Sequence, residues 1–470
     1  MTQKTLLLGL VSLAFSLVVS AQQNMTLYQM HDILQSNTLN PSVVSDCRWN
    51  VGFPVLGNVS VAASAPVSYN SLGAGKEFID GPKVVSLLKD NNLISSNENI
   101  ALIMLGYRTE TMYLQFNINE RVSLASAFAK PPFEILLLGN SQFAGQTVSG
   151  TFDFAAMHYR EYALSAAFGL GENTWLGLRG KLMFGRIGAL GHNTISLTTD
   201  LSTYAMSVVS DFDSKVSMPG EVEINPASGT TKKFKHNLSV NHFVFNPSNI
   251  GGGLDLGFNT TLENGLKVSA SILNLGMINW TKDVHEFTLN NTVNYSGSTN
   301  INSWDDFIDT LKSIYRPYHA NIDKYSQWLS PAVMAGANYP VHDYFRAGIT
   351  GYGEFTPAGV PWAISALLLT QDVPYVQGAL SYTVTNNSFV NIGLGAGLNL
   401  GVFNIHAMTD NIIGLFSPYS QKYATFQFGI NFKFGCDGDF GGDSKKYKSI
   451  PCPSHGGGSA KSYRAVPCPK

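Results

Sequence analysis

The sequence predicts a single closed transmembrane antiparallel β-barrel of about 14 strands, within a range of roughly 12 to 16, with short helices in its loops. Three observations carry this prediction. Apolar and polar residues alternate in segment after segment, and charged residues are only 13% of the chain, against about a quarter in soluble proteins. No run beyond the N-terminal leader reaches the roughly 18 apolar residues of a spanning helix. Because lipid cannot satisfy backbone groups, the sheet is expected to close on itself.

The start of the chain has the pattern of a signal peptide. Lys4 precedes an apolar run over residues 6–19, and a small-residue cleavage site ends at Ala21. Since no cysteine lies at this junction, a lipid anchor is not expected. The predicted parts are a signal peptide over residues 1–21, a barrel over 22–435 and a flexible tail over 436–470.

The clearest hairpin covers residues 252–280, where two alternating runs flank the turn residues Glu263, Asn264 and Gly265. Side chains on a strand point alternately to opposite faces, so each run has one apolar and one polar face. The polar face carries Asp255 in the first run and Lys267 in the second.

A second strand, over residues 175–184, places leucines on one face and two cations on the other. A charge at the middle of the lipid face costs about 2 to 4 kcal/mol. We therefore expect the charges of both segments to face the lumen. The candidate lumen-facing charges are Arg179, Lys181, Asp255 and Lys267.

The remaining elements follow from the same periodicity. Further strands are predicted over residues 58–65, 100–107, 112–119, 151–168, 194–200, 202–211, 331–339, 344–354, 362–370, 376–384, 389–399, 402–408 and 423–434, and short helices over 82–89 and 304–314. Residues 24–41 have too weak a pattern to assign a strand or a helix, and we expect only a short N-terminal segment before the barrel. Residues 281–330 are expected to form the longest loop.

A stripe of glycines occupies alternate positions of one predicted strand, at Gly393, Gly395 and Gly397. Two interpretations stay open. The stripe lets another backbone or a plug approach the wall closely, or it marks a sharply curved part of the wall.

The sequence gives no sign of catalysis. Metalloprotease, nucleophile-elbow and phosphate-loop motifs are missing, and the ten histidines lack metal-ligand spacing. A net charge of −2 gives no case for nucleic-acid binding. We therefore expect a non-enzymatic protein without a catalytic residue, cofactor or metal.

Four cysteines permit three complete pairings. Closing a barrel places its first and last strands side by side, so Cys47 and Cys436 are expected at the same rim, in an oxidising compartment. Their bond would leave Cys452 and Cys468, which occupy two copies of a short repeat in the tail. A metal site and free thiols are the alternatives for these cysteines.

Three stretches carry a resemblance to a known family: LNPSVVSDCRWNVGFPVLGNVSV from Leu39, LDLGFNTTLENGLKVSASILNLGMINW from Leu254 and TDNIIGLFSPYSQKYATFQFGINFKFG from Thr409. They resemble a Bacteroidota outer-membrane β-barrel family whose domain has no known function. That family is similar in pattern to type IX secretion barrels and to FadL-like transporters. The resemblance implies a barrel in the outer membrane and no catalytic signature.

The expected function is transport or secretion-associated assembly, with passage of a small or hydrophobic solute. The alternative is an adhesion or scaffold barrel that binds a partner through its long loops and tail. Expected partners are outer-membrane lipid and a periplasmic or secretion-system protein. Short connections are expected on the periplasmic side of such barrels, and their positions here predict that both termini are periplasmic.

Overall fold

The computed structural model describes residues 25–72, 80–171, 173–239, 242, 247–295, 317–371, 373 and 375–436. Among these residues, no helix is long and apolar enough to cross a membrane. The predicted signal peptide, the helix over 304–314 and nearly all of the tail lie outside the described residues.

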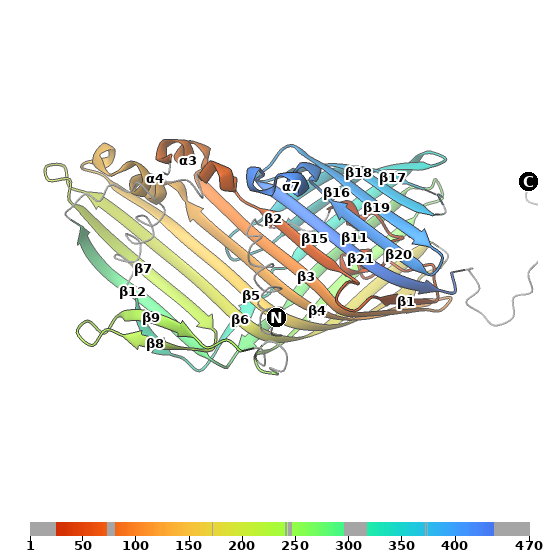
Figure 1. The fold of residues 1–470 in the computed structure, drawn as a ribbon, viewed down its shortest axis with the longest axis horizontal. Helices are drawn as coiled ribbons and strands as arrows, with labels where there is room; N and C mark the ends of the chain where they lie inside the picture. The colour runs from red at the N-terminus through yellow and green to blue at the C-terminus, as the bar shows by residue number, and fades with distance from the viewer. Residues whose placement is uncertain are drawn as a thin grey trace, which may run out of the picture.

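The main sheet closes on itself as an antiparallel barrel (Figure 1). The last strand, β21 (Tyr423–Phe434), pairs with β1 (Trp49–Gly52) and with β2 (Val59–Ser64), which form one wall strand with a break. Both also pair with β3 (Asn91–Arg108), so the first and last strands meet. From β3 the wall continues in sequence order through β4 (Met112–Ala129), β5 (Thr147–Gly169) and β6 (Thr174–Thr199).

The next three wall strands are each assembled from separate segments. β7 (Met206–Ser217) pairs with the second half of β6, and β10 (Ile250–Thr261) pairs with the first half. The hairpin of β8 (Gly220–Ile224) and β9 (Thr231–His236) leaves the wall between them. The other composite strands are β11 (Lys267–Trp280) with β12 (Val284–Tyr295), and β13 (Tyr318–Asn321) with β14 (Tyr325–Trp328) and β15 (Ala332–His342).

Five shorter strands complete the wall before β21: β16 (Phe345–Glu354), β17 (Trp362–Thr370), β18 (Val376–Thr385), β19 (Asn391–Leu400) and β20 (Phe403–Thr409). With composite strands counted once, the barrel has 14 strands, which confirms the predicted fold. Residues 281–330 do not form a simple loop, because β12, β13 and β14 belong to the wall.

The outer face of the barrel is apolar. On β17, Trp362, Ile364 and Leu368 are 38%, 51% and 41% exposed, whereas the alternating Ala363 and Ser365 are at most 1% exposed. This is the alternation of a strand whose outer face meets lipid and whose inner face meets a filled lumen.

Short helices lie in the connections. The predicted helix over 82–89 is confirmed as α3 (Gly81–Leu87), whose N-terminus is capped by Asp80. Figure 1 shows α3, α4 (Lys130–Leu138) and α7 (Ile412–Phe416) along the same edge of the barrel. The remaining helical turns are α2 (Met25–Tyr28), η1 (Leu34–Thr38), η2 (Tyr69–Leu72), η3 (Ser141–Phe143) and η4 (Pro418–Ser420).

A disulfide joins the two ends of the barrel. Cys47 and Cys436 are bonded, with Cα atoms 3.9 Å apart, although 389 residues separate them in the chain. The bond lies beside the pairing of Trp49 with Phe434. Cys452 and Cys468 lie outside the described residues, so their pairing stays a prediction.

Candidate functional site

Residues 25–44, which we call the plug, fill the lumen. Most of their side chains are buried, including the polar residues Gln35, Ser36 and Asn40 at 0% exposure. Periodicity predicts only a short lead here, because the segment has the pattern of neither a strand nor a helix. Its density of Asn, Gln, Ser and Thr was the available signal, since such side chains suit a polar lumen.

One end of the plug is held by Asp410, which follows β20. Its carboxylate accepts hydrogen bonds from the backbone N–H groups of Met25 and Thr26, at 2.8 and 2.9 Å, and from the Thr26 hydroxyl at 2.5 Å. The Tyr423 hydroxyl donates a further bond at 3.0 Å. Asp410 therefore fixes the first turn of α2 to the wall.

The middle of the plug is held by side-chain amides. Asn338 of β15 donates to the Gln29 side chain at 2.7 Å, and Gln29 donates to Thr350 of β16 at 3.2 Å. Further along, Gln35 exchanges hydrogen bonds with Asn431 of β21, at 2.8 and 3.2 Å. These neutral bonds contribute roughly 0.5 to 1.5 kcal/mol each.

The other end of the plug contacts Arg179, one of the predicted lumen-facing charges. Arg179 is 1% exposed and donates to the Thr38 carbonyl at 3.0 Å and to the Asn37 side chain at 2.8 Å. Its guanidinium also pairs with Asp255 at 3.0 Å, and Lys181 pairs with the same carboxylate at 2.8 Å. The structure thus brings Arg179, Lys181 and Asp255 together, and Arg179 joins them to the plug.

Two further wall residues, which were not among the predicted charges, extend these three into a network. Glu161 of β5 lies 3.5 Å from Lys181 and 3.1 Å from Arg121 of β4. Arg121 continues the inward-facing polar set of the predicted strand 112–119, so extending that strand would have found it.

Lys267 lies apart from this network, and no ion pair of it occurs among the described residues. It acts instead on His31 in the plug. Burial, and then the positive charge of Lys267, lower the pKa of His31 to about 4. His31 is therefore neutral in the plug at neutral pH.

Glycines on the inner face make room for the plug. A Cβ atom on Gly395 would lie 2.9 Å from the Met30 sulfur, and one on Gly397 would lie 2.8 Å from Ile33. These contacts favour the close-approach interpretation of the glycine stripe. On β6, a Cβ atom on Gly177 would lie 2.2 Å from the backbone of Pro41.

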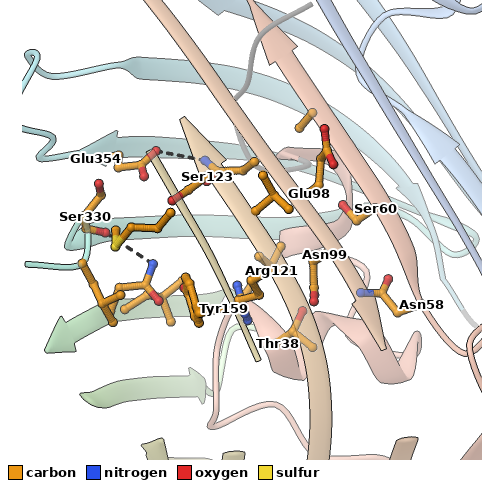
Figure 2. Close-up of a pocket in the computed structure, with 18 of the residues that line it drawn as sticks. Thr38, Asn58, Ser60, Glu98, Asn99, Arg121, Ser123, Tyr159, Ser330 and Glu354 are labelled. Atoms are coloured by element: carbon orange, nitrogen blue, oxygen red, sulfur yellow. Dashed lines mark hydrogen bonds between the residues drawn. The ribbon is translucent and has the colours of Figure 1, made fainter. Parts of the chain in front are cut away.

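A small cavity lies between the plug and the wall (Figure 2). Its volume is about 60 Å³, room for roughly four to six water-sized groups. The plug supplies Leu27, Thr38 and Leu39, and the wall supplies mainly polar side chains. In the described part of the chain, no cluster of three metal-ligating side chains occurs.

The model of one protein family, described as a family of unknown function (DUF5723), matches residues 41–410. The chain belongs to the DUF5723 family. The DUF5723 match begins at Pro41, so most of the plug precedes it, and it ends at Asp410, the residue that holds the plug. No curated protein matches the chain in sequence.

Several solved barrels are similar to this DUF5723 chain at low identity. The Ralstonia pickettii toluene transporter TbuX is 9% identical over 86% of this chain and 94% of its own, with a TM-score of 0.40. A Pseudomonas aeruginosa FadL homologue is 9% identical over 88% and 99%, with a TM-score of 0.38. The translocator domain of the Neisseria meningitidis autotransporter NalP is 8% identical over 82% and 88%, with a TM-score of 0.28.

Proposed function

We propose that this protein is a non-enzymatic outer-membrane barrel that passes a small solute when its plug rearranges inside the lumen. The observation that carries the proposal is how the lumen is closed. The plug packs apolar side chains such as Leu27 and Ile33 against the wall, and it is also held by hydrogen bonds to Asp410 and by those of Gln29 and Gln35. These hydrogen bonds exchange with water at small net cost, and none of them is part of the backbone pairing between wall strands, so the plug can rearrange while the wall stays closed.

A disulfide between the plug and the wall, which we call the lock, tests this proposal. The hydroxyl oxygens of Thr26 in the plug and Ser381 in β18 are 2.8 Å apart. We expect the double substitution Thr26→Cys and Ser381→Cys to form a disulfide that lowers channel conductance in planar bilayers, and reduction to restore it.

The matched control uses another hydroxyl pair at the same separation. Ser149 and Ser196, on β5 and β6 away from the plug, also have oxygens 2.8 Å apart. Their cysteine pair should leave conductance unchanged, and the wild-type protein under both redox conditions accounts for the Cys47–Cys436 bond. Equal conductance of the locked, reduced and control proteins would contradict the proposal.

A scaffold or secretion-associated role is the second candidate, and the uneven height of the wall favours it. β6 has 26 residues, whereas β17 has 9. A tilted strand needs about ten residues to cross the bilayer, so β6 extends well beyond it and offers a surface to a protein partner. An interaction that survives in the locked protein and fails when this extension is altered would support the scaffold role.

Both termini are proposed to be periplasmic. The Cys47–Cys436 bond lies at the end of the barrel with the short connections, because the Arg108 N–H, beside the turn after β3, bonds to the Arg48 carbonyl. Short connections are typical of the periplasmic side. Protease treatment of intact cells should spare the C-terminal tail, and its removal while the long loops survive would reverse the orientation.

A further inference from the structure

We propose that the cavity beside the plug binds a small zwitterion of the α-amino acid class. This inference rests on the proposed transport function and adds the chemical class of the solute. It follows from the charges on the cavity wall, which are of both signs and held by different strands (Figure 2).

One part of the cavity is cationic. Arg121 and Lys181 line it, and they belong to the network with Arg179, Glu161 and Asp255. That network holds three cations and two carboxylates, and no ion pair joins it to Glu98 or Glu354, the other carboxylates of the lining, among the described residues. A solute carboxylate beside Arg121 and Lys181 would balance the third cation.

Another part of the cavity is anionic, because Glu98 and Glu354 both line it. Glu354 is 4% exposed, and its carboxylate accepts hydrogen bonds from the Tyr352 hydroxyl at 2.6 Å and from the Asn97 side chain at 3.3 Å. No cation pairs with Glu354 among the described residues. A buried carboxylate without a cation is costly, so this position suits the ammonium group of a solute.

The neutral lining adds a further polar contact. The side-chain oxygen of Asn99 is buried and has no hydrogen-bond partner among the described residues, although it faces the cavity region (Figure 2). It can accept a bond from a solute N–H group. Of the 21 lining residues only seven are apolar, so a hydrocarbon would desolvate charged groups without replacing their contacts.

The volume limits the size of the solute. About 60 Å³ holds roughly four to six water-sized groups, which matches the smallest amino acids. Glycine and alanine place a carboxylate and an ammonium group on one carbon, so each can reach both signs of charge within a small space.

Calorimetric titration of the purified full chain in detergent tests the inference. Four probes are compared. Alanine carries both charges, propionate only the negative charge, ethylamine only the positive charge, and toluene neither. We expect alanine to bind at least tenfold more tightly than the singly charged probes, and toluene not to compete with it.

The substitution Glu354→Gln keeps the size of the side chain and removes its charge. It should weaken alanine and ethylamine binding at least tenfold and leave propionate binding unchanged. Tyr352→Phe, which removes a hydrogen bond that orients Glu354, should weaken alanine binding less. Glu263→Gln, in an exposed turn, is the matched control and should bind like the wild type.

Toluene binding that displaces alanine, or equal affinities for all probes, would overturn the zwitterion inference. The two proposals fail separately. If the Thr26–Ser381 lock lowers ion conductance while alanine does not bind, only the solute class is wrong. If the lock has no effect on conductance, the transport proposal fails whatever binds in the cavity.

Discussion

At the scale of single residues, the plug depends on a few side chains from distant parts of the chain. The inward direction of Arg179, Lys181 and Asp255 could be predicted, because strand alternation and the cost of charge in lipid leave one orientation. Asp410 could not be predicted. It follows the end of a strand, and its partner Thr26 is 384 residues away, so no local pattern links them.

Removing the negative charge of Asp410 should loosen the start of the plug. In Asp410→Asn an amide nitrogen replaces one carboxylate oxygen, and this nitrogen cannot accept the hydrogen bond from the Met25 N–H group. Losing such a bond costs about 1 to 3 kcal/mol, so the Met25 and Thr26 amides should exchange hydrogen roughly 10- to 100-fold faster. Asp200→Asn, at an exposed turn, is the control, and unchanged exchange in Asp410→Asn would contradict the role of this residue.

Acid should loosen the plug through His31. Its pKa is lowered to about 4 in the plug from 6.5, so the docked plug favours the neutral ring. The stabilisation is complete above pH 6.5 and is lost as the pH falls towards 4. Proteolysis of the plug should therefore increase over this window in the wild type.

The variant His31→Gln isolates the effect from carboxylates that titrate in the same range. It should show a smaller increase in plug proteolysis between pH 6.5 and 4. His192→Gln changes an exposed histidine of the wall and should follow the wild type. Identical pH profiles for the wild type and His31→Gln would show that His31 does not control docking.

At the scale of elements, alternation predicted most strands but failed where the wall departs from one continuous run. Residues 175–184 and 194–200 were predicted as separate strands, yet both belong to β6. Gly185, Gly188 and Gly191 interrupt the apolar pattern between them, because their Cβ positions would meet aromatic rings. Long-range pairing decided the continuity of this strand, and a local pattern does not contain that information.

A methyl group at Gly177 should displace the plug from β6. The added Cβ atom of Gly177→Ala would lie 2.2 Å from the backbone of Pro41 and Ser42, and overpacking of this kind costs roughly 1 to 3 kcal/mol. We expect larger channel conductance and faster proteolysis of the plug.

Gly180 provides the control on the same strand, because a Cβ atom there would meet nothing within 4 Å. Gly180→Ala should conduct like the wild type. If both alanine variants behave alike, the plug does not lie against β6 as described.

At the scale of the whole molecule, the closed barrel could be predicted because low charge, alternation and closure in lipid all favour the same fold. The lumen could not, since its contents depend on contacts across the whole length of the chain. One contact between distant parts of the chain could be predicted. It is the seam, where the first strand meets the last beside the Cys47–Cys436 bond, because closure itself brings these strands together.

Removing the seam bond should destabilise the barrel. The disulfide joins residues 389 apart, and for a loop of that length the chain-entropy effect is about 6 kcal/mol, although measured effects are often smaller. The variant with Cys47→Ser and Cys436→Ser should unfold at a lower temperature, measured by the heat-dependent shift of the folded band in gel electrophoresis. A variant with Cys452→Ser and Cys468→Ser is the control, and an equal loss in both would contradict a specific role for the seam.

The long sequence separation of the plug contacts has a consequence for biogenesis. Gln35 is synthesised early, whereas Asn431, its partner in β21, emerges 396 residues later. Contacts so distant in sequence form slowly, and the plug cannot complete its bonds until the final strand is inserted. With periplasmic termini, as proposed, the N-terminal segment has to stay unpaired in that compartment while the wall assembles. Closure of the barrel and docking of its first residues are then one late event.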